Sequence, residues 1–160
     1  MRFSRRVVLI SVSAVACLSA AAVYTFAPGS DDKIAVPVPD AKVATMCRAL
    51  HAELPAKVNG LSRHDLKPRS DLIAGWGNPA IVLRCGVPRP AIDLDPNADA
   101  VDVDGVSWSF DRLGNGSARL TTTLRMAYVE VTLPKKRATD VYPLTDLAGA
   151  VKHTIPEGIA

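Results

Sequence analysis

Two cysteines, Cys47 and Cys85, carry the most readily interpreted chemistry in this chain of 160 residues. The third cysteine, Cys17, lies within an apolar run near the N-terminus. Two thiols in an oxidising compartment can form only one intramolecular disulfide, whereas a metal site would need a further soft ligand nearby. We therefore predict that Cys47 and Cys85 are bonded to each other if this part of the chain is exported.

A histidine beside an aspartate, His64-Asp65, suggests acid–base chemistry. Neighbours in sequence rarely face one another productively, and this pair sits in a charged stretch typical of a solvated loop. The chain has no G-x-S-x-G elbow and no H-E-x-x-H motif, and its histidines lack metal-ligand spacing. We predict no catalytic residues, and a hydrolase that uses His64 or His51 with Asp65 is the weakest alternative.

Trp76, Arg84 and Arg125 are the candidate residues for binding a small ligand or an anion. Arg84 lies on an apolar strand, where an arginine either reaches solvent across the sheet or pairs with a carboxylate. An anion site would require Arg84 and Arg125 to converge in one pocket. Trp76 lies just before the strand, and we expect its side chain to cover the core.

Residues 93–104 form an acidic loop in which oxygen-bearing side chains occur at alternate positions, as they do in a calcium-binding loop. The sixth position is Ala98 instead of glycine, Pro96 interrupts the loop, and a strand rather than a helix follows. We predict a solvated loop, no bound metal and no cofactor, with weak candidate ligands at Asp93, Asp95, Asn97, Asp99 and Asp104.

Residues 7–27 contain no charge and follow Arg2, Arg5 and Arg6. A helix of this length spans roughly 30 Å, the thickness of the hydrocarbon core of a bilayer. Arginines before the segment and acids after it place the N-terminus in the cytoplasm. We predict a membrane anchor that holds the remaining chain outside a cell membrane.

Two other fates of this segment stay open. Small residues that end at Ala16, Ala22 and Ala27 could form a signal-peptidase site, which would release a secreted domain. Alternatively, the residues before Cys17 loosely resemble a lipoprotein cleavage box, with Cys17 as the lipid carrier. The chain stays apolar after Cys17, which favours the anchor.

The net charge of +3 comes from the three arginines that precede the predicted membrane segment. The chain has 19 basic and 16 acidic residues, and without Arg2, Arg5 and Arg6 the numbers are 16 and 16. A nucleic-acid-binding protein needs a clustered basic face, which this composition does not supply. We expect the partners to be the membrane, through residues 7–27, and an envelope protein or polymer, but no nucleic acid.

The order of predicted elements indicates one exported domain. Residues 1–6 form the cytoplasmic flank, residues 28–40 a proline-containing linker, and residues 41–160 the domain. Helical periodicity marks residues 40–54 and 143–154, whereas residues 55–78 are turn-rich. Strand patterns occur at residues 80–85, 101–103, 106–111, 119–125 and 129–133, with a change of phase near Met126. The prediction is an α+β domain with a mostly antiparallel sheet of four or five strands between an N-terminal and a C-terminal helix.

These elements carry short motifs in a fixed order. They are Cys47 before Leu54-Pro55, Trp76-Gly77, the run from Val82 to Val87, Gly105-Val106-x-Trp108, and Arg125 before the run from Tyr128 to Pro134. In these motifs the chain resembles a family of small actinobacterial proteins with an N-terminal membrane or signal segment and an exported domain of unknown function. The resemblance covers residues 47–134. It implies a cell-envelope protein with a Cys47–Cys85 pair, and it implies no activity.

The functional expectation is a non-catalytic binding or interaction module outside the membrane. A domain that binds a small ligand or an anion is the first alternative, and a hydrolase the second. A flat apolar patch would favour the interaction module, a convergent arginine pair the binder, and a deep cleft with a histidine and a serine or carboxylate the enzyme.

Overall fold

A computed structural model describes residues 33–159. The predicted membrane segment, the basic flank before it and the lipidation candidate Cys17 lie outside these residues, as does the first part of the linker. Within residues 33–159, the helices are too short or too polar for any of them to cross a membrane.

The first helix, α1 (Ala41–Glu53), forms where the periodicity predicts it. The side chain of Asp40 accepts a hydrogen bond of 2.9 Å from the backbone N–H of Val43, which satisfies one of the free donors at the helix start. The helix ends before Pro55, which cannot continue the backbone hydrogen bonding. Cys47 and Leu50 are buried on its inner side.

The second helix, α2 (Tyr142–Thr154), also confirms the prediction. Pro143 lies in its first turn, where the missing N–H has no intrahelical acceptor to lose. The predicted apolar stripe is fully buried and consists of Leu144, Leu147, Val151 and, just past the helix, Ile155.

The sheet has eight antiparallel strands, so the prediction of four or five is wrong. The strands are β1 (Lys57–Val58), β2 (Leu61–His64), β3 (Ile73–Trp76), β4 (Ile81–Val87), β5 (Ala100–Val103), β6 (Val106–Arg112), β7 (Ala118–Thr122) and β8 (Tyr128–Leu133). Their order across the sheet is β1-β2-β3-β4-β8-β7-β6-β5. Two 3-10 helices, η1 (Ala91–Leu94) and η2 (Lys135–Arg137), complete the described elements.

The missed strands β1, β2 and β3 lie in the stretch predicted to be turn-rich. They contain only two to four residues each, too few for a periodic pattern to stand out. Gly75 looks like a turn residue but is needed inside β3, because a Cβ atom there would lie 2.7 Å from Leu66 Cδ2. These strands form by successive pairing outward from β4, with β3 on β4, β2 on β3 and β1 on β2.

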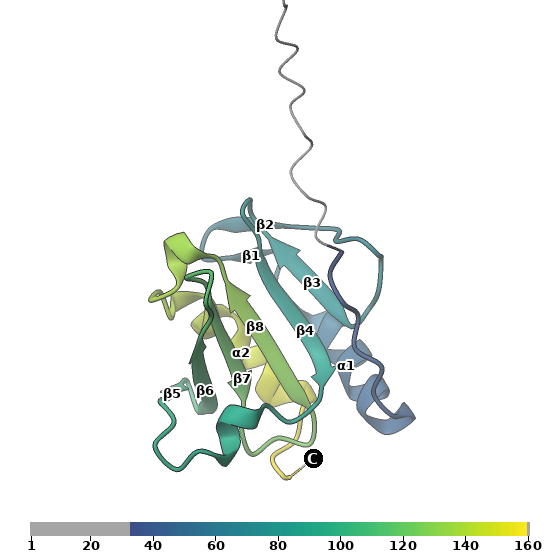
Figure 1. The fold of residues 1–160 in the computed structure, drawn as a ribbon. Helices are drawn as coiled ribbons and strands as arrows, with labels where there is room; N and C mark the ends of the chain where they lie inside the picture. The colour runs from purple at the N-terminus through teal and green to yellow at the C-terminus, as the bar shows by residue number, and fades with distance from the viewer. Residues whose placement is uncertain (1–32, 160) are drawn as a thin grey trace, which may run out of the picture. The chain divides into compact units, whose positions relative to one another are not determined.

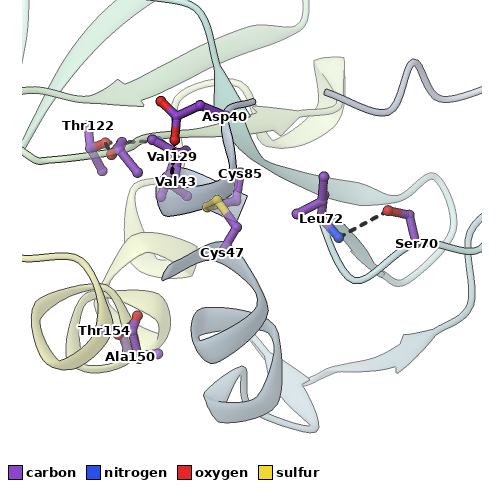
Figure 2. Close-up of a disulfide and its surroundings, with 11 residues drawn as sticks. Asp40, Val43, Cys47, Ser70, Leu72, Cys85, Thr122, Val129, Ala150 and Thr154 are labelled. Carbon is purple, nitrogen blue, oxygen red and sulfur yellow. Dashed lines mark hydrogen bonds between the residues drawn. A yellow bond between two sulfur atoms is a disulfide. The ribbon is translucent and has the colours of Figure 1, made fainter. Parts of the chain in front are cut away.

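The two helices cover one face of the sheet, behind it in Figure 1. The inward side chains of the central strands form the core with the helices, and they include Leu83, Trp108, Leu120 and Val131. Cys47 of α1 and Cys85 of β4 are joined by a disulfide with a Cα separation of 5.5 Å, which confirms the predicted pair (Figure 2). The bond links the first helix to the centre of the sheet.

The opposite face of the sheet is polar and partly covered. The segment before α1 crosses it at β4, where a Cβ atom at Gly86 would lie 2.7 Å from Pro39 Cγ. Gly86 also has a φ of +86° at the register shift between Cys85 and Val87, so glycine is required there on both counts. Farther across the sheet, η1 packs against β6.

The predicted change of phase near Met126 is a break between two strands. Strand β7 ends at Thr122 and β8 begins at Tyr128. The strand predicted at residues 119–125 includes Leu124, but Leu124 lies past the end of β7 with a φ of +53° and is 68 % exposed. That part of the strand prediction is wrong, because the chain turns away at residue 123 to reach β8.

Candidate functional site

Trp76 does not face a ligand. Its side chain is completely buried, and its indole Nε1 donates a hydrogen bond of 3.0 Å to the carbonyl oxygen of Pro55. A buried indole N–H needs such a partner, and this one ties β3 to the end of α1. Trp76 is thus a core residue, which removes it from the ligand-binding candidates.

Arg84 pairs with a carboxylate, as one of the two sequence-based alternatives states. Its Nε and Nη2 atoms donate hydrogen bonds of 2.9 and 3.1 Å to the two carboxylate oxygens of Glu130, on the neighbouring strand β8. Its Nη1 donates to the carbonyl oxygen of Ala35 at 3.1 Å. All three guanidinium nitrogens therefore have protein acceptors.

Arg125 is buried at the end of α2. Its Nη1 donates to the carbonyl oxygen of Ile155 at 3.1 Å, and its Nη2 donates to the carbonyl oxygen of Gly105 at 3.0 Å. A cation at a helix C-terminus satisfies free carbonyl groups and interacts favourably with the helix dipole. Arg84 and Arg125 are therefore held by separate sets of partners, and their contacts do not form the convergent anion site that we considered.

A polar cleft of about 650 Å³ lies between the end of α1 and strands β2 and β3. Its lining includes both histidines of the hydrolase alternative, His51 and His64. Arg63 Nη2 lies 2.7 Å from His51 Nε2. Because a guanidinium can only donate, His51 Nε2 is the acceptor and its lone pair is occupied.

The electrostatics of His51 follow from this contact. Burial and the neighbouring positive charge of Arg63 lower the pKa of His51 below its ordinary value of 6.5, although Asp71 and Asp65 oppose the shift. Arg63 also donates to the carbonyl oxygens of His51 and Leu54, both at 3.3 Å. Arg63 thus stabilises the C-terminal turn of α1, just as Arg125 does for α2.

His64 and Asp65 do not form an acid–base pair. His64 Nε2 lies 2.9 Å from the carbonyl oxygen of Gly77, while the carboxylate of Asp65 pairs with Arg69. The serine in the cleft, Ser70, accepts a hydrogen bond from the backbone N–H of Leu72 (Figure 2). Among the described residues, no hydrogen bond joins a cleft serine to either histidine, so the contacts do not assemble a nucleophile and a base.

The acidic loop is not arranged around a metal ion. Asp95 Oδ1 accepts a hydrogen bond from the backbone N–H of Asn97, a local turn. Asp104 lies in the two-residue turn between β5 and β6, with a φ of +50°. In residues 33–159 no three acidic, histidine or cysteine side chains come close enough to hold a metal ion.

A different surface collects exposed apolar side chains. It lies at the end of the sheet where β7 ends and β8 begins (lower end of the sheet in Figure 1). Leu124 and Ile159, which is 76 % exposed, line the same cavity of about 320 Å³. Leu94 of η1 is exposed as well, at 71 %, and follows directly on Asp93 of the cavity wall. We call Leu124, Ile159 and this cavity the β7–β8 end surface.

The backbone holds the end surface in place. The N–H of Gly158 donates to the carbonyl oxygen of Leu124 at 3.0 Å, and the N–H of Met126 donates to that of Pro156 at 2.9 Å. Leu124 therefore keeps a left-handed conformation that is unusual for a bulky residue. Exposed apolar side chains that lie together are a feature of interaction sites.

The walls of the cavity carry acids. Asp93, Asp95 and Asp99 line it together with Arg89, Ser109, Thr123 and Tyr128. The side chain of Asp93 is only 6 % exposed. Among residues 33–159 its Oδ1 has no hydrogen-bond partner, and its Oδ2 lies 3.9 Å from Arg89 Nε.

Sequence reasoning found part of this surface for another reason. It singled out Asp93, Asp95 and Asp99 as weak calcium ligands, but it placed Leu124 in a strand and assigned no role to Ile159. No local pattern brings residues 93, 124 and 159 together. The clue in the sequence was the change of phase near Met126, which marks the strand end that exposes Leu124.

Comparison with protein families gave one match. A family model described as a protein of unknown function, DUF3515, covers residues 7–160. Searches of curated proteins and of solved structures returned no match.

Proposed function

The chain belongs to the DUF3515 family of proteins of unknown function, and we propose that it is a non-catalytic binding module displayed outside the membrane of an actinobacterial cell. The partner is an envelope protein. Residues 7–27 anchor the chain, and the domain presents the β7–β8 end surface.

The disulfide supports a location outside the cytoplasm. Cys47 and Cys85 are bonded between the first helix and the central strand β4. Such bonds persist in oxidising compartments and are rare in the cytosol, where thiols are kept reduced. The arginines before residues 7–27 support the same orientation.

The observation that carries the binding role is the exposed Leu124. This side chain is 68 % exposed and apolar, and it sits in a backbone conformation that disfavours leucine. Neither property stabilises the isolated domain. A partner that covers Leu124 and Ile159 would give this arrangement a function.

The location is tested by fractionating cells that express the full chain with a C-terminal tag. We expect the tag in membranes after high-salt washing and accessible to protease added to intact cells. A tag mainly in the medium, at the mass of a chain cleaved near residue 28, would overturn the anchor. A tag protected in intact cells would overturn the orientation.

The binding role is tested with a photo-crosslinking residue in place of Leu124 in the full chain, expressed in cells. Tyr142 is a matched control, because its side chain is also large and exposed but lies at the start of α2. We expect a discrete crosslinked protein from position 124 and not from position 142. Equal labelling from both positions would contradict a partner at the end surface.

A further inference from the structure

We infer that the partner inserts a basic side chain into the acidic cavity of the β7–β8 end surface, while apolar neighbours of that side chain cover Leu124 and Ile159. This inference rests on the proposed function and specifies the chemistry of the partner. The occupant is a polypeptide segment with a lysine or arginine flanked by apolar residues.

Charge is the first support. Residues 91–105 contain five aspartates and no basic residue. Three of these, Asp93, Asp95 and Asp99, line the cavity, whereas Arg89 is the one basic residue among its described lining residues. The cavity therefore has an excess of negative charge and attracts a cation.

The buried carboxyl group of Asp93 is the second and independent support. A carboxylate withdrawn from water is unfavourable unless it is paired and hydrogen-bonded. No group in the described part of the chain donates a hydrogen bond to Asp93 Oδ1. Arg89 Nε, at 3.9 Å from Oδ2, is too far away for a hydrogen bond. A cation in the cavity would lie beside Asp93 and offset the charge of its carboxylate.

The geometry favours an organic cation over a metal ion. The three aspartates line one cavity, yet among residues 33–159 no three such side chains come within reach of one ion. Asp95 Oδ1 is already engaged with the N–H of Asn97. An ammonium or guanidinium group on an aliphatic stem can instead contact the apolar wall along its length and the carboxylates at its tip.

The apolar rim favours a polypeptide over a free amine. Leu124 and Ile159 are mostly exposed to solvent although they line the cavity. A small amine in about 320 Å³ would leave those outer surfaces in water. Apolar residues on either side of a basic side chain would cover them, and burial of apolar surface would add to the charge interaction.

The test measures binding of fluorescent peptides to the full chain in detergent micelles by anisotropy. The probe is a peptide with one lysine between two leucines, and a second peptide replaces that lysine with arginine. Matched controls replace it with norleucine, which keeps the apolar stem, or with glutamate. We expect at least one of the two basic peptides to bind about tenfold or more tightly than the norleucine peptide, and the preference to weaken with salt.

Variants locate the interaction. Asp93→Asn should weaken binding of the basic peptide about tenfold, whereas Arg89→Ala should strengthen it by removing a competing cation. Asp111→Asn is the control, because Asp111 is an acidic residue on β6 that does not line the cavity. Equal binding of the basic and norleucine peptides, or equal effects of Asp93→Asn and Asp111→Asn, would overturn the inference.

The inference and the proposed function can fail separately. A crosslinked partner at position 124 with no preference for basic peptides would leave the binding module intact and refute the basic side chain. Butylammonium that competes fully with the basic peptide at equal concentration would show that the cavity takes a free amine, and would refute a polypeptide occupant. If no protein crosslinks to position 124, binding at the end surface itself is refuted.

Discussion

Arg84 and Glu130 face each other directly across strands β4 and β8 and form two hydrogen bonds, of 2.9 and 3.1 Å. Arg119 of β7 approaches the same carboxylate, with its Nε 3.5 Å from Glu130 Oε2. The Glu130 side chain is nearly buried beneath these two arginines. The pair is therefore a structural link across the polar face of the sheet and leaves little of Arg84 for an external anion.

Replacing Arg84 with methionine should lower the free energy of unfolding by about 3 kcal/mol, because it leaves the buried charge of Glu130 without its bidentate partner. Urea denaturation measures the change. The double variant Arg84→Met with Glu130→Met should recover most of the loss, because both charges are then gone. If the double variant is as unstable as the sum of the two single variants, the two residues do not act as a pair.

Removing the disulfide should destabilise the domain by about 4 kcal/mol, the loop-entropy value for a sequence separation of 38 residues. The Tm should fall by on the order of 10 °C in scanning calorimetry under reducing conditions. Cys47→Ala and Cys85→Ala should have similar effects, and the double variant should add little to either. Additive losses would show that the cysteines stabilise the domain independently of their bond.

Stability should fall as the pH drops through the ordinary pKa of His51, about 6.5. The pKa of His51 is lowered in the folded domain, so below that pH the unfolded chain takes up a proton that the folded chain resists. The unfolded state then binds more protons, which means that stability rises with pH across this window. Urea unfolding between pH 7 and pH 5 should show a smaller acid loss in His51→Gln than in the parent chain. An identical loss in both would refute this role of His51.

Replacing Arg63 with methionine should raise the pKa of His51, because the positive charge of Arg63 is the second cause of the lowered value after burial. The shift is measured by NMR titration of the imidazole ring. Arg48→Met is the control, because Arg48 is an exposed residue of α1 that does not contribute to the shift. A pKa unchanged by Arg63→Met would show that burial alone sets it.

Leu124→Asn should stabilise the isolated domain by about 1 kcal/mol, because asparagine tolerates the left-handed conformation that Leu124 adopts with a φ of +53°. The same change should abolish capture of the proposed partner at the end surface. Urea denaturation gives the stability, and a crosslinker in place of Ile159 reports the partner. A clear loss of stability would mean that Leu124 is a packing residue.

Periodic segments of adequate length could be predicted from the sequence alone. Both helices, the central strand with Cys85 and the β5–β6 hairpin follow from apolar spacing and turn residues. The disulfide followed as well, because Cys47 and Cys85 are the only two cysteines in the part of the chain predicted to be exported. These features depend on neighbours within a few residues or on a single possible pairing.

The short strands and the partners of the arginines could not be predicted in this way. Strand β3 pairs with the edge of β4, β2 with β3 and β1 with β2, and local propensity does not encode such pairing. Arg84, Arg125 and Trp76 looked available for a ligand, but their acceptors are Glu130, Ile155 and Pro55, between 21 and 46 residues away. Only the folded chain brings those groups within hydrogen-bond distance.

Two amphipathic helices, a β-rich centre, one disulfide and an acidic loop can all be predicted from the amino-acid sequence. Which polar groups are satisfied and which surface stays open depends on how the chain packs. Asp93, Leu124 and Ile159 meet because the turn after β7, the η1 segment and the chain after α2 all reach the same end of the sheet. Local sequence fixes backbone conformation through near neighbours, whereas a binding surface is the product of long-range packing.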